Sequence, residues 1–155
     1  MSDVPTTAAR VRIVQVLLTI VALEFFGPIV RDFSASHAFH PTWVGHARVH
    51  LVWLLGFMGL SGIVNFYLIW FARPFDLRNL RLSLVWLCCN LGGFWIAYLL
   101  APIYDGAITV PGVHVHIFGY DENVFVFAVL STIAAIAAAL LRTLNEREGA
   151  GHAAH

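Results

Sequence analysis

The sequence has few charged residues and no lysine. Only 12% of its 155 residues are charged, nine of them arginines and nine acidic, so the formal net charge is zero. Such a chain offers no basic patch for nucleic acid, and its composition is far from the mix of a soluble domain. It also lacks a glycine-rich phosphate loop and a Ser-His-Asp set on one face. The sequence therefore contains no candidate residues for phosphate-loop nucleotide binding or for serine-hydrolase catalysis.

Cysteine is almost absent. Cys88 and Cys89 are adjacent, so they cannot form an ordinary structural disulfide with each other. We expect both to be small buried apolar residues inside a helix.

Long hydrophobic runs are what the sequence has most of. Hydrophobic residues make up 59% of the chain, with a mean hydropathy of +0.78. Four blocks approach the roughly 20 residues that a helix needs to cross a bilayer, and they are continuously apolar rather than alternating as in a barrel strand. The sequence therefore predicts an all-α integral membrane protein, a four-transmembrane-helix bundle forming a single domain over residues 1–145, with a disordered polar tail at 146–155. The predicted spans are about Val11–Val30, Val49–Ala72, Leu80–Ile103 and Val124–Leu144.

The small residues inside these blocks indicate close helix packing. Glycines at positions 56, 59 and 62 in the second span, glycines 92 and 93 in the third, and the alanine run at 134–139 let helix backbones approach.

The arginines predict an orientation. Arg10 and Arg12 precede the first span, three arginines fill the link between the second and third, and two follow the fourth, whereas the loop between the third and fourth has none. By the positive-inside rule both termini and the link at 73–81 are cytoplasmic, and loops 31–48 and 104–123 face outward. The setting that fits is a bacterial inner membrane. Arg31 and Arg48 oppose this pattern, and we interpret them as charges with local partners.

This orientation gathers six of the eight histidines on the outward side. His46 and His50 are four residues apart at the start of a helix, so both can hold one metal ion. His114 and His116 share a side if their loop is extended. With no thiolate nearby, imidazoles suit a transition metal, with iron or copper favoured and zinc an option. The candidate ligands are His37, His46, His50, His114 and His116. The alternative is that these histidines cap helices or bond backbone carbonyls at a wet interface.

One acidic residue lies within a predicted span. Glu24 is about two turns below the outward end of the first block, where an ionised carboxylate is costly. It is a candidate metal ligand or general acid, or else a protonated residue hydrogen-bonded to a neighbouring helix. Arg31, seven residues on, is a candidate partner. Asn90, in the middle of the third span, is placed to hydrogen-bond across helices.

The histidine-rich segment also resembles a known signature. Residues 36–50 carry Ser-His-x-x-His-Pro-x-Trp-x-x-His-Ala-Arg-x-His, which is similar to the signature of a group of small four-helix membrane proteins of unassigned activity. The resemblance covers about fifteen residues closely, and it departs at His40, where similar sequences usually carry Asn. It implies that six residues belong to one shared site: His37, Pro41, Trp43, His46, Arg48 and His50. The four-span layout is also weakly similar to the sterol isomerase and sigma-2 receptor superfamily, from which no residue can be carried over.

The leading hypothesis is a metal-dependent membrane enzyme, an oxidoreductase that acts on a lipid-soluble substrate at the outward face. A redox metal would activate oxygen or move electrons. A cavity lined by Trp53, Phe57 and Phe94 would admit the apolar substrate, and Glu24 or Asp121 would be a carboxylate ligand or carry protons. Zinc would instead indicate hydrolysis.

Two further hypotheses stay open. One is a non-catalytic metal-binding, pH-sensing or accessory membrane protein, because the outward histidines would gain charge as the outside acidifies. The other is a metal-free isomerase or ligand-binding bundle centred on Glu24. The expected partners are the lipid bilayer and an apolar small molecule, with further copies of the chain as another candidate and no nucleic acid.

Overall fold

The structure is a computed structural model that describes the backbone of residues 4–109 and 115–153, and the side chains of residues 7–109 and 115–146. Within these residues, four helical stretches are long and apolar enough to cross a membrane, which confirms the predicted four-helix class. The last three begin two to four residues earlier than predicted, and the helix that holds the first begins at Val4, because the first helical turns contain polar residues that hydropathy does not count. The stretches are Thr7–Asp32, Gly45–Phe71, Leu77–Ile103 and Glu122–Glu146.

Three of the four stretches consist of more than one element. The first comprises α1 (Val4–Ala22), the 3-10 turn η1 (Leu23–Phe26) and α2 (Gly27–Asp32). The second is α3 (Gly45–Phe66) followed by the π-helical turn η2 (Tyr67–Phe71), and the third is α4 (Leu77–Leu100) with the turn η3 (Ala101–Ile103). A two-residue antiparallel pair, β1 (His116–Ile117) and β2 (Tyr120–Asp121), precedes α5 (Glu122–Ala153).

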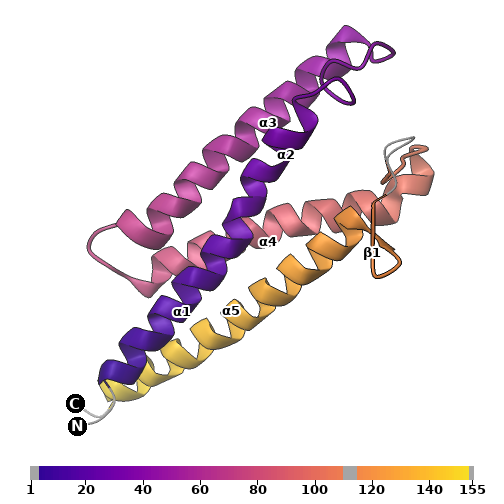
Figure 1. The fold of residues 1–155 in the computed structure, drawn as a ribbon. Helices are drawn as coiled ribbons and strands as arrows, with labels where there is room; N and C mark the ends of the chain where they lie inside the picture. Colours follow the sequence, from indigo (N-terminus) through magenta and orange to yellow (C-terminus); the bar gives the residue numbers. More distant parts are fainter. Residues whose placement is uncertain (1–3, 110–114, 154–155) are drawn as a thin grey trace.

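The helices meet at one end and separate towards the other (Figure 1). At the end that holds both termini, α1 packs against α4 and α5, and η2 packs against α1 and α4. Towards the opposite end, α2 and α3 stay together and diverge from the α4–α5 pair. We call these the terminal end and the loop end. The loop at 33–44 and the loop residues 104–109 and 115–121 lie at the loop end.

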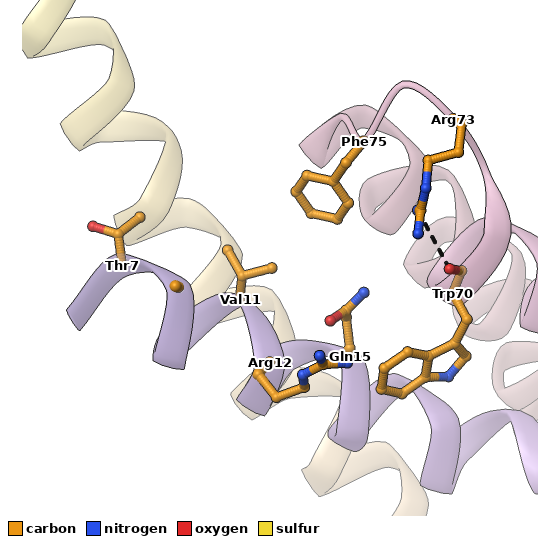
Figure 2. A pocket seen from close by; sticks show the side chains of 8 residues that line it. Thr7, Val11, Arg12, Gln15, Trp70, Arg73 and Phe75 are labelled. Atoms are coloured by element: carbon orange, nitrogen blue, oxygen red, sulfur yellow. Dashed lines mark hydrogen bonds between the residues drawn. The ribbon is translucent and has the colours of Figure 1, made fainter. Parts of the chain in front are cut away.

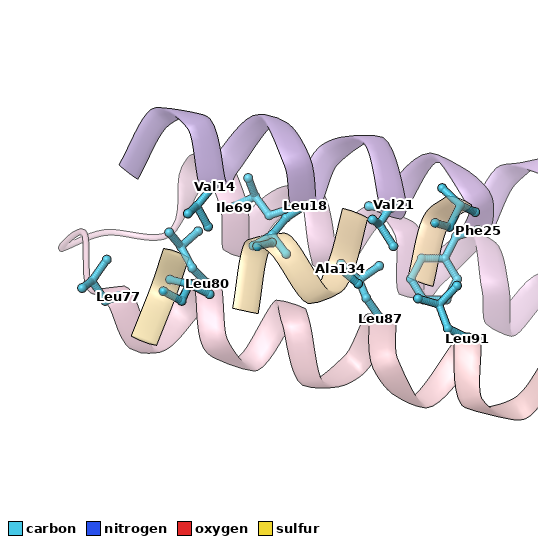
Figure 3. Close-up of a cluster of buried hydrophobic side chains, with 14 of the residues drawn as sticks. Val14, Leu18, Val21, Phe25, Ile69, Leu77, Leu80, Leu87, Leu91 and Ala134 are labelled. Carbon is cyan, nitrogen blue, oxygen red and sulfur yellow. The ribbon is translucent and has the colours of Figure 1, made fainter. Parts of the chain in front are cut away.

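The core runs along the α1–α4–α5 contact (Figure 3). Val14, Leu18 and Val21 on α1 recur at helical spacing and are at most 1% exposed. They pack with Leu80, Leu87 and Leu91 from α4 and with residues of α5, including Ala134 and Ala137. Because lipid is as apolar as this core, such packing stabilises the bundle mainly through close contact.

Two glycines let α3 approach the first span closely. A Cβ atom at Gly62 would lie 2.6 Å from the Phe26 ring, and one at Gly59 would lie 3.0 Å from Ile29. The predicted role in helix packing therefore holds at these two positions. At glycines 56, 92 and 93 a Cβ would meet nothing within 4 Å.

Two predictions differ from the structure. Cys88 and Cys89 are exposed on α4 rather than buried, because Leu87 and Leu91 take the inward positions of that turn. The backbone of α5 also continues to Ala153, through most of the tail predicted to be disordered. Glu and Arg at 146–148 have high helix propensity and extend a helix that packing has already formed.

Candidate functional site

A cleft of about 580 Å³ lies where the helices diverge. All four helical stretches contribute to its walls, and most of the lining is apolar. The lining residues are Glu24, Phe25, Pro28, Asp32, Leu54, Leu55, Phe57, Met58, Trp86, Cys89, Asn90, Gly93, Phe94, Ala97, Asn123 and Phe127.

Glu24 supplies a carboxylate to this cleft. The Asn90 side chain on α4 donates a hydrogen bond from Nδ2 to Glu24 Oε2, which confirms that Asn90 bonds across helices. Among the described side chains no other group bonds the carboxylate, so Oε1 remains available. Both residues are half-buried. Glu24 therefore presents one bonded and one available oxygen to a mainly apolar cavity.

A proline explains the local backbone at Glu24. Pro28 has no N–H to donate to the Glu24 carbonyl four residues earlier, and its ring would crowd that carbonyl in a regular α-helix. The carbonyl instead accepts from the Gly27 N–H, three residues on, within the 3-10 turn η1. Short 3-10 stretches inside long helices are frequent at functional positions.

A second cleft of about 420 Å³ lies between the first span and α5. It shares Glu24, Pro28 and Asp32 with the first cleft, along with two residues of α5. Arg31 on its rim donates to both carboxylate oxygens of Glu122, at 3.2 and 3.4 Å. The two clefts thus meet at Glu24 beneath a charged rim.

Arg31 therefore does not pair with Glu24, as the sequence had suggested, but with the first residue of α5. The fold brings Arg31 on α2 and Glu122 at the start of α5 to the same rim, although the two residues are 91 positions apart in the sequence. The expected local partner is found only for Arg48, whose Nη2 donates to the His40 carbonyl at 2.8 Å.

Two of the three predicted aromatic residues line the cavity. Phe94 lines the cleft and stacks on Phe127, with ring centroids 3.7 Å apart, and Phe57 lines it from α3. Trp53 does not line it: the side chain is 67% exposed, and its ring centroid is 6.1 Å from that of His50. Residues 53 and 57 lie on the same side of α3, about 40° apart around its axis. Trp53 is one turn nearer the start of the helix and precedes Leu54, the first α3 residue of the lining.

The histidines form separate groups. His46 and His50 lie on one side of α3 with their Nε2 atoms 3.0 Å apart. His37 instead bonds the Ser36 hydroxyl through Nδ1 at 2.9 Å, and its Nε2 is 3.8 Å from Asp32. His116 stands across from Asp121 in the short strand pair. His114 lies outside the described residues.

Within the described part of the chain, no three His, Cys, Asp or Glu residues are grouped so as to hold a metal. The structure therefore brings together His46 and His50, and it does not bring His37 or His116 to them as a cluster. The loop carrying His37 turns towards α2, whereas the histidine pair begins α3. The direction in which a loop leaves a helix is not encoded in histidine spacing.

The second candidate catalytic carboxylate has a structural contact. Asp121 Oδ1 accepts from the Asn123 N–H at 2.9 Å, which satisfies a backbone donor at the start of α5. Catalytic roles for Asp121 and Glu24 stay predictions.

The residues of the histidine signature divide in the same way. His37, His40, Pro41 and Trp43 line an open cavity of about 800 Å³ with residues of the loop that includes Asp105. The ring centroids of His37 and Trp43 are 6.4 Å apart. His46 and His50 are not part of this lining.

Comparison with protein-family models, with curated proteins and with solved structures finds no match. The residues of this chain are therefore the basis for inferring its function.

Proposed function

We propose that this integral membrane protein binds an apolar small molecule that enters the Glu24 cleft from the bilayer. The observation that carries the proposal is a carboxylate with one available oxygen in the wall of a largely apolar cavity between transmembrane helices. Ligand sites commonly combine apolar walls with a few fixed polar groups. Glu24 and Asn90 are the polar groups here.

The chemistry of the pair defines the ligand class. Asn90 holds one carboxylate oxygen, so the other can accept a hydrogen bond from a hydroxyl or amine. Phe57, Phe94 and Trp86 supply flat apolar surface for a ring system or chain. The expected ligand is a lipid-soluble molecule with one hydroxyl or amino group. Glu24 would also be placed to transfer a proton to it, as an isomerase requires.

Two adjacent glycines provide a matched test. Gly93 lines the cleft and Gly92 does not, and a Cβ at either would meet nothing within 4 Å. Leucine at 93 should fill the cleft, whereas leucine at 92 should leave it open. We expect organic extraction of the detergent-purified protein to yield about one apolar molecule per chain. Mass spectrometry should show this molecule lost in Gly93→Leu and in Glu24→Gln, and kept in Gly92→Leu.

A reagent test does not depend on a co-purified ligand. Dicyclohexylcarbodiimide is apolar and reacts with protonated carboxyl groups, so it should modify Glu24 in the parent protein and in Gly92→Leu. Filling the cleft in Gly93→Leu should slow this reaction, and Glu24→Gln should abolish it. Unchanged reaction in Gly93→Leu, or no adduct at Glu24 in the parent, would contradict the proposal.

A second candidate function is supported by the His46–His50 pair. Two imidazole nitrogens 3.0 Å apart can turn towards one transition metal ion, as a helical pair at this spacing does. This supports the metal-dependent oxidoreductase hypothesis, with iron or copper favoured. It ranks second because the described residues supply only two ligands at that place.

Elemental analysis by inductively coupled plasma mass spectrometry tests this candidate. The parent protein should carry a transition metal that the folded His46→Ala/His50→Ala double variant loses, while a His40→Ala variant keeps it. Absence of metal from the parent after reconstitution with iron, copper and zinc would rule the candidate out.

The arginine pattern supports an orientation for either function. We place the terminal end on the cytoplasmic side and the histidine loops outside, in a bacterial cytoplasmic membrane. Accessibility of single cysteines introduced at Ser36 and Asn79, to a membrane-impermeant maleimide in a Cys88→Ser/Cys89→Ser background, tests this placement.

A further inference from the structure

The terminal end holds a basic pocket that the Glu24 site does not use (Figure 2). Its volume is about 680 Å³, and it lies between the start of α1 and the η2–α4 link. Its lining consists of Thr7, Ala8, Val11, Arg12, Gln15, Trp70, Arg73 and Phe75. Arg73 reaches into the pocket from the link, and Arg12 lies on the opposite side.

Both guanidinium groups are held in place without a carboxylate. Arg12 lies over the Trp70 ring, with Cζ 5.0 Å from the ring centroid. The indole is itself fixed, because its Nε1 donates to Thr19 Oγ1 at 2.9 Å. Arg73 Nη1 donates to the backbone carbonyls of Ala72 at 3.2 Å and Trp70 at 3.4 Å.

The charge of this pair is uncompensated among the described side chains. The four ion pairs found there involve Arg31, His37, Arg78 and Arg142, and none includes Arg12 or Arg73. Each guanidinium keeps further N–H donors in a planar arrangement that matches phosphate oxygens. Two such groups facing one pocket favour a phosphate-bearing anion.

The position of the pocket identifies the source of that anion. Thr7 lies in the first turn of α1, which begins at Val4, and Trp70 is one residue from the end of the second membrane-spanning stretch. The pocket therefore lies at the boundary of the apolar region, where lipid headgroups are found. Val11, Trp70 and Phe75 add an apolar wall that suits the glycerol and upper acyl portions of a lipid. Basic pockets between transmembrane helices on the cytoplasmic side are known to bind anionic lipids.

We propose that this pocket binds the phosphate headgroup of an anionic phospholipid, with Arg12 and Arg73 as its two cationic contacts. The site is separate from the Glu24 cleft and does not depend on the function proposed there.

Titration of the detergent-purified protein with phosphatidylglycerol, followed by native mass spectrometry, tests the proposal. The parent should bind phosphatidylglycerol more tightly than zwitterionic phosphatidylcholine. Arg12→Gln/Arg73→Gln should raise the Kd for phosphatidylglycerol about tenfold or more. Circular dichroism confirms the fold, and the Arg73→Gln single variant, with a smaller loss, serves if the double variant does not fold.

The matched control is Arg78→Gln/Arg142→Gln. It removes the same charge from residues paired with Asp76 and Glu146 that do not line the pocket. Unchanged affinity in this control supports the proposal. An equal loss in both double variants would show attraction to general surface charge and overturn it. Equal binding of both lipids by the parent would also overturn it.

Inorganic phosphate distinguishes the two sources of the anion. If the lipid is the ligand, millimolar phosphate should leave the phosphatidylglycerol adduct in place. Complete displacement by phosphate at that concentration would assign the pocket to a soluble anion instead and overturn the lipid proposal.

Discussion

The two ends of the bundle contain cross-helix polar pairs in opposite surroundings. At the terminal end, Ser83 on α4 donates to Asn65 on α3 at 2.7 Å, and both residues are 0% exposed. At the loop end, Asn90 on α4 donates to Glu24, and that pair is half-buried beside a cleft. The same kind of hydrogen bond joins packed helices at one end and lines a cavity at the other.

The difference shows what each pair is suited to do. A neutral amide and a hydroxyl are sufficient to join two helices within lipid, and the Asn65–Ser83 pair consists of these two groups. A carboxylate is a more costly group to hold in a membrane, and its second oxygen has no described partner. Packing alone does not require a carboxylate at the loop end, which is why we propose the ligand site there.

The largest effect should come from disturbing the close contact of α3 with the first span. Valine at Gly62 would place a Cβ 2.6 Å from the Phe26 ring, so we expect Gly62→Val to destabilise the fold by about 3 kcal/mol. Gly56→Val is the control, because nothing lies within 4 Å of its Cβ. Unfolding in mixed dodecyl sulfate micelles measures both. Equal stability of the two variants would contradict this packing.

Breaking the two polar pairs should cost different amounts of stability, and both losses should be smaller than that of Gly62→Val. Asn65→Ala leaves the buried Ser83 hydroxyl without its acceptor, and we expect a loss of about 2 kcal/mol. Asn90→Ala should cost less than about 1 kcal/mol, because Glu24 borders a cavity and can find other partners. The same unfolding assay compares them. A greater loss for Asn90→Ala would mean that the loop-end pair is primarily structural.

The smallest change in stability should come from breaking the Arg31–Glu122 ion pair at the rim of the second cleft. The Arg31 side chain is 63% exposed and that of Glu122 is 29% exposed. A double-mutant cycle with Arg31→Gln and Glu122→Gln should give a coupling energy below about 1 kcal/mol that declines with added salt. A coupling energy of several kcal/mol that does not change with salt would contradict this expectation. It would show that the Arg31–Glu122 ion pair is a major stabilising contact of the loop end.

The sequence predicted the features that depend on local composition. The four spans follow from block length and hydropathy, and the bond from Asn90 follows from a polar residue in the middle of an apolar helix. The close approach at Gly59 and Gly62 was likewise anticipated, although spacing alone could not separate these glycines from Gly56.

What could not be predicted depends on directions in space. The pairing of Arg31 with Glu122 joins residues 91 positions apart, and it follows from how far the two pairs of helices diverge. The separation of His37 from His46 and His50 likewise depends on how the loop at 33–44 folds. The exposed position of Trp53 also depends on where along α3 the cleft begins, because residue 53 shares a helix face with the lining residue Phe57 but lies one turn before it.

The turn at Pro28 has a mechanical consequence. Glu24, Pro28 and Asp32 border both clefts, so the segment that carries them is a partition with a cavity on each side. A swing of this partition towards α5 would enlarge one chamber at the expense of the other. Its pivot would be the 3-10 turn, where the regular helical bond is already missing. A ligand bound by Glu24 in one cleft would therefore determine the volume of the other cleft.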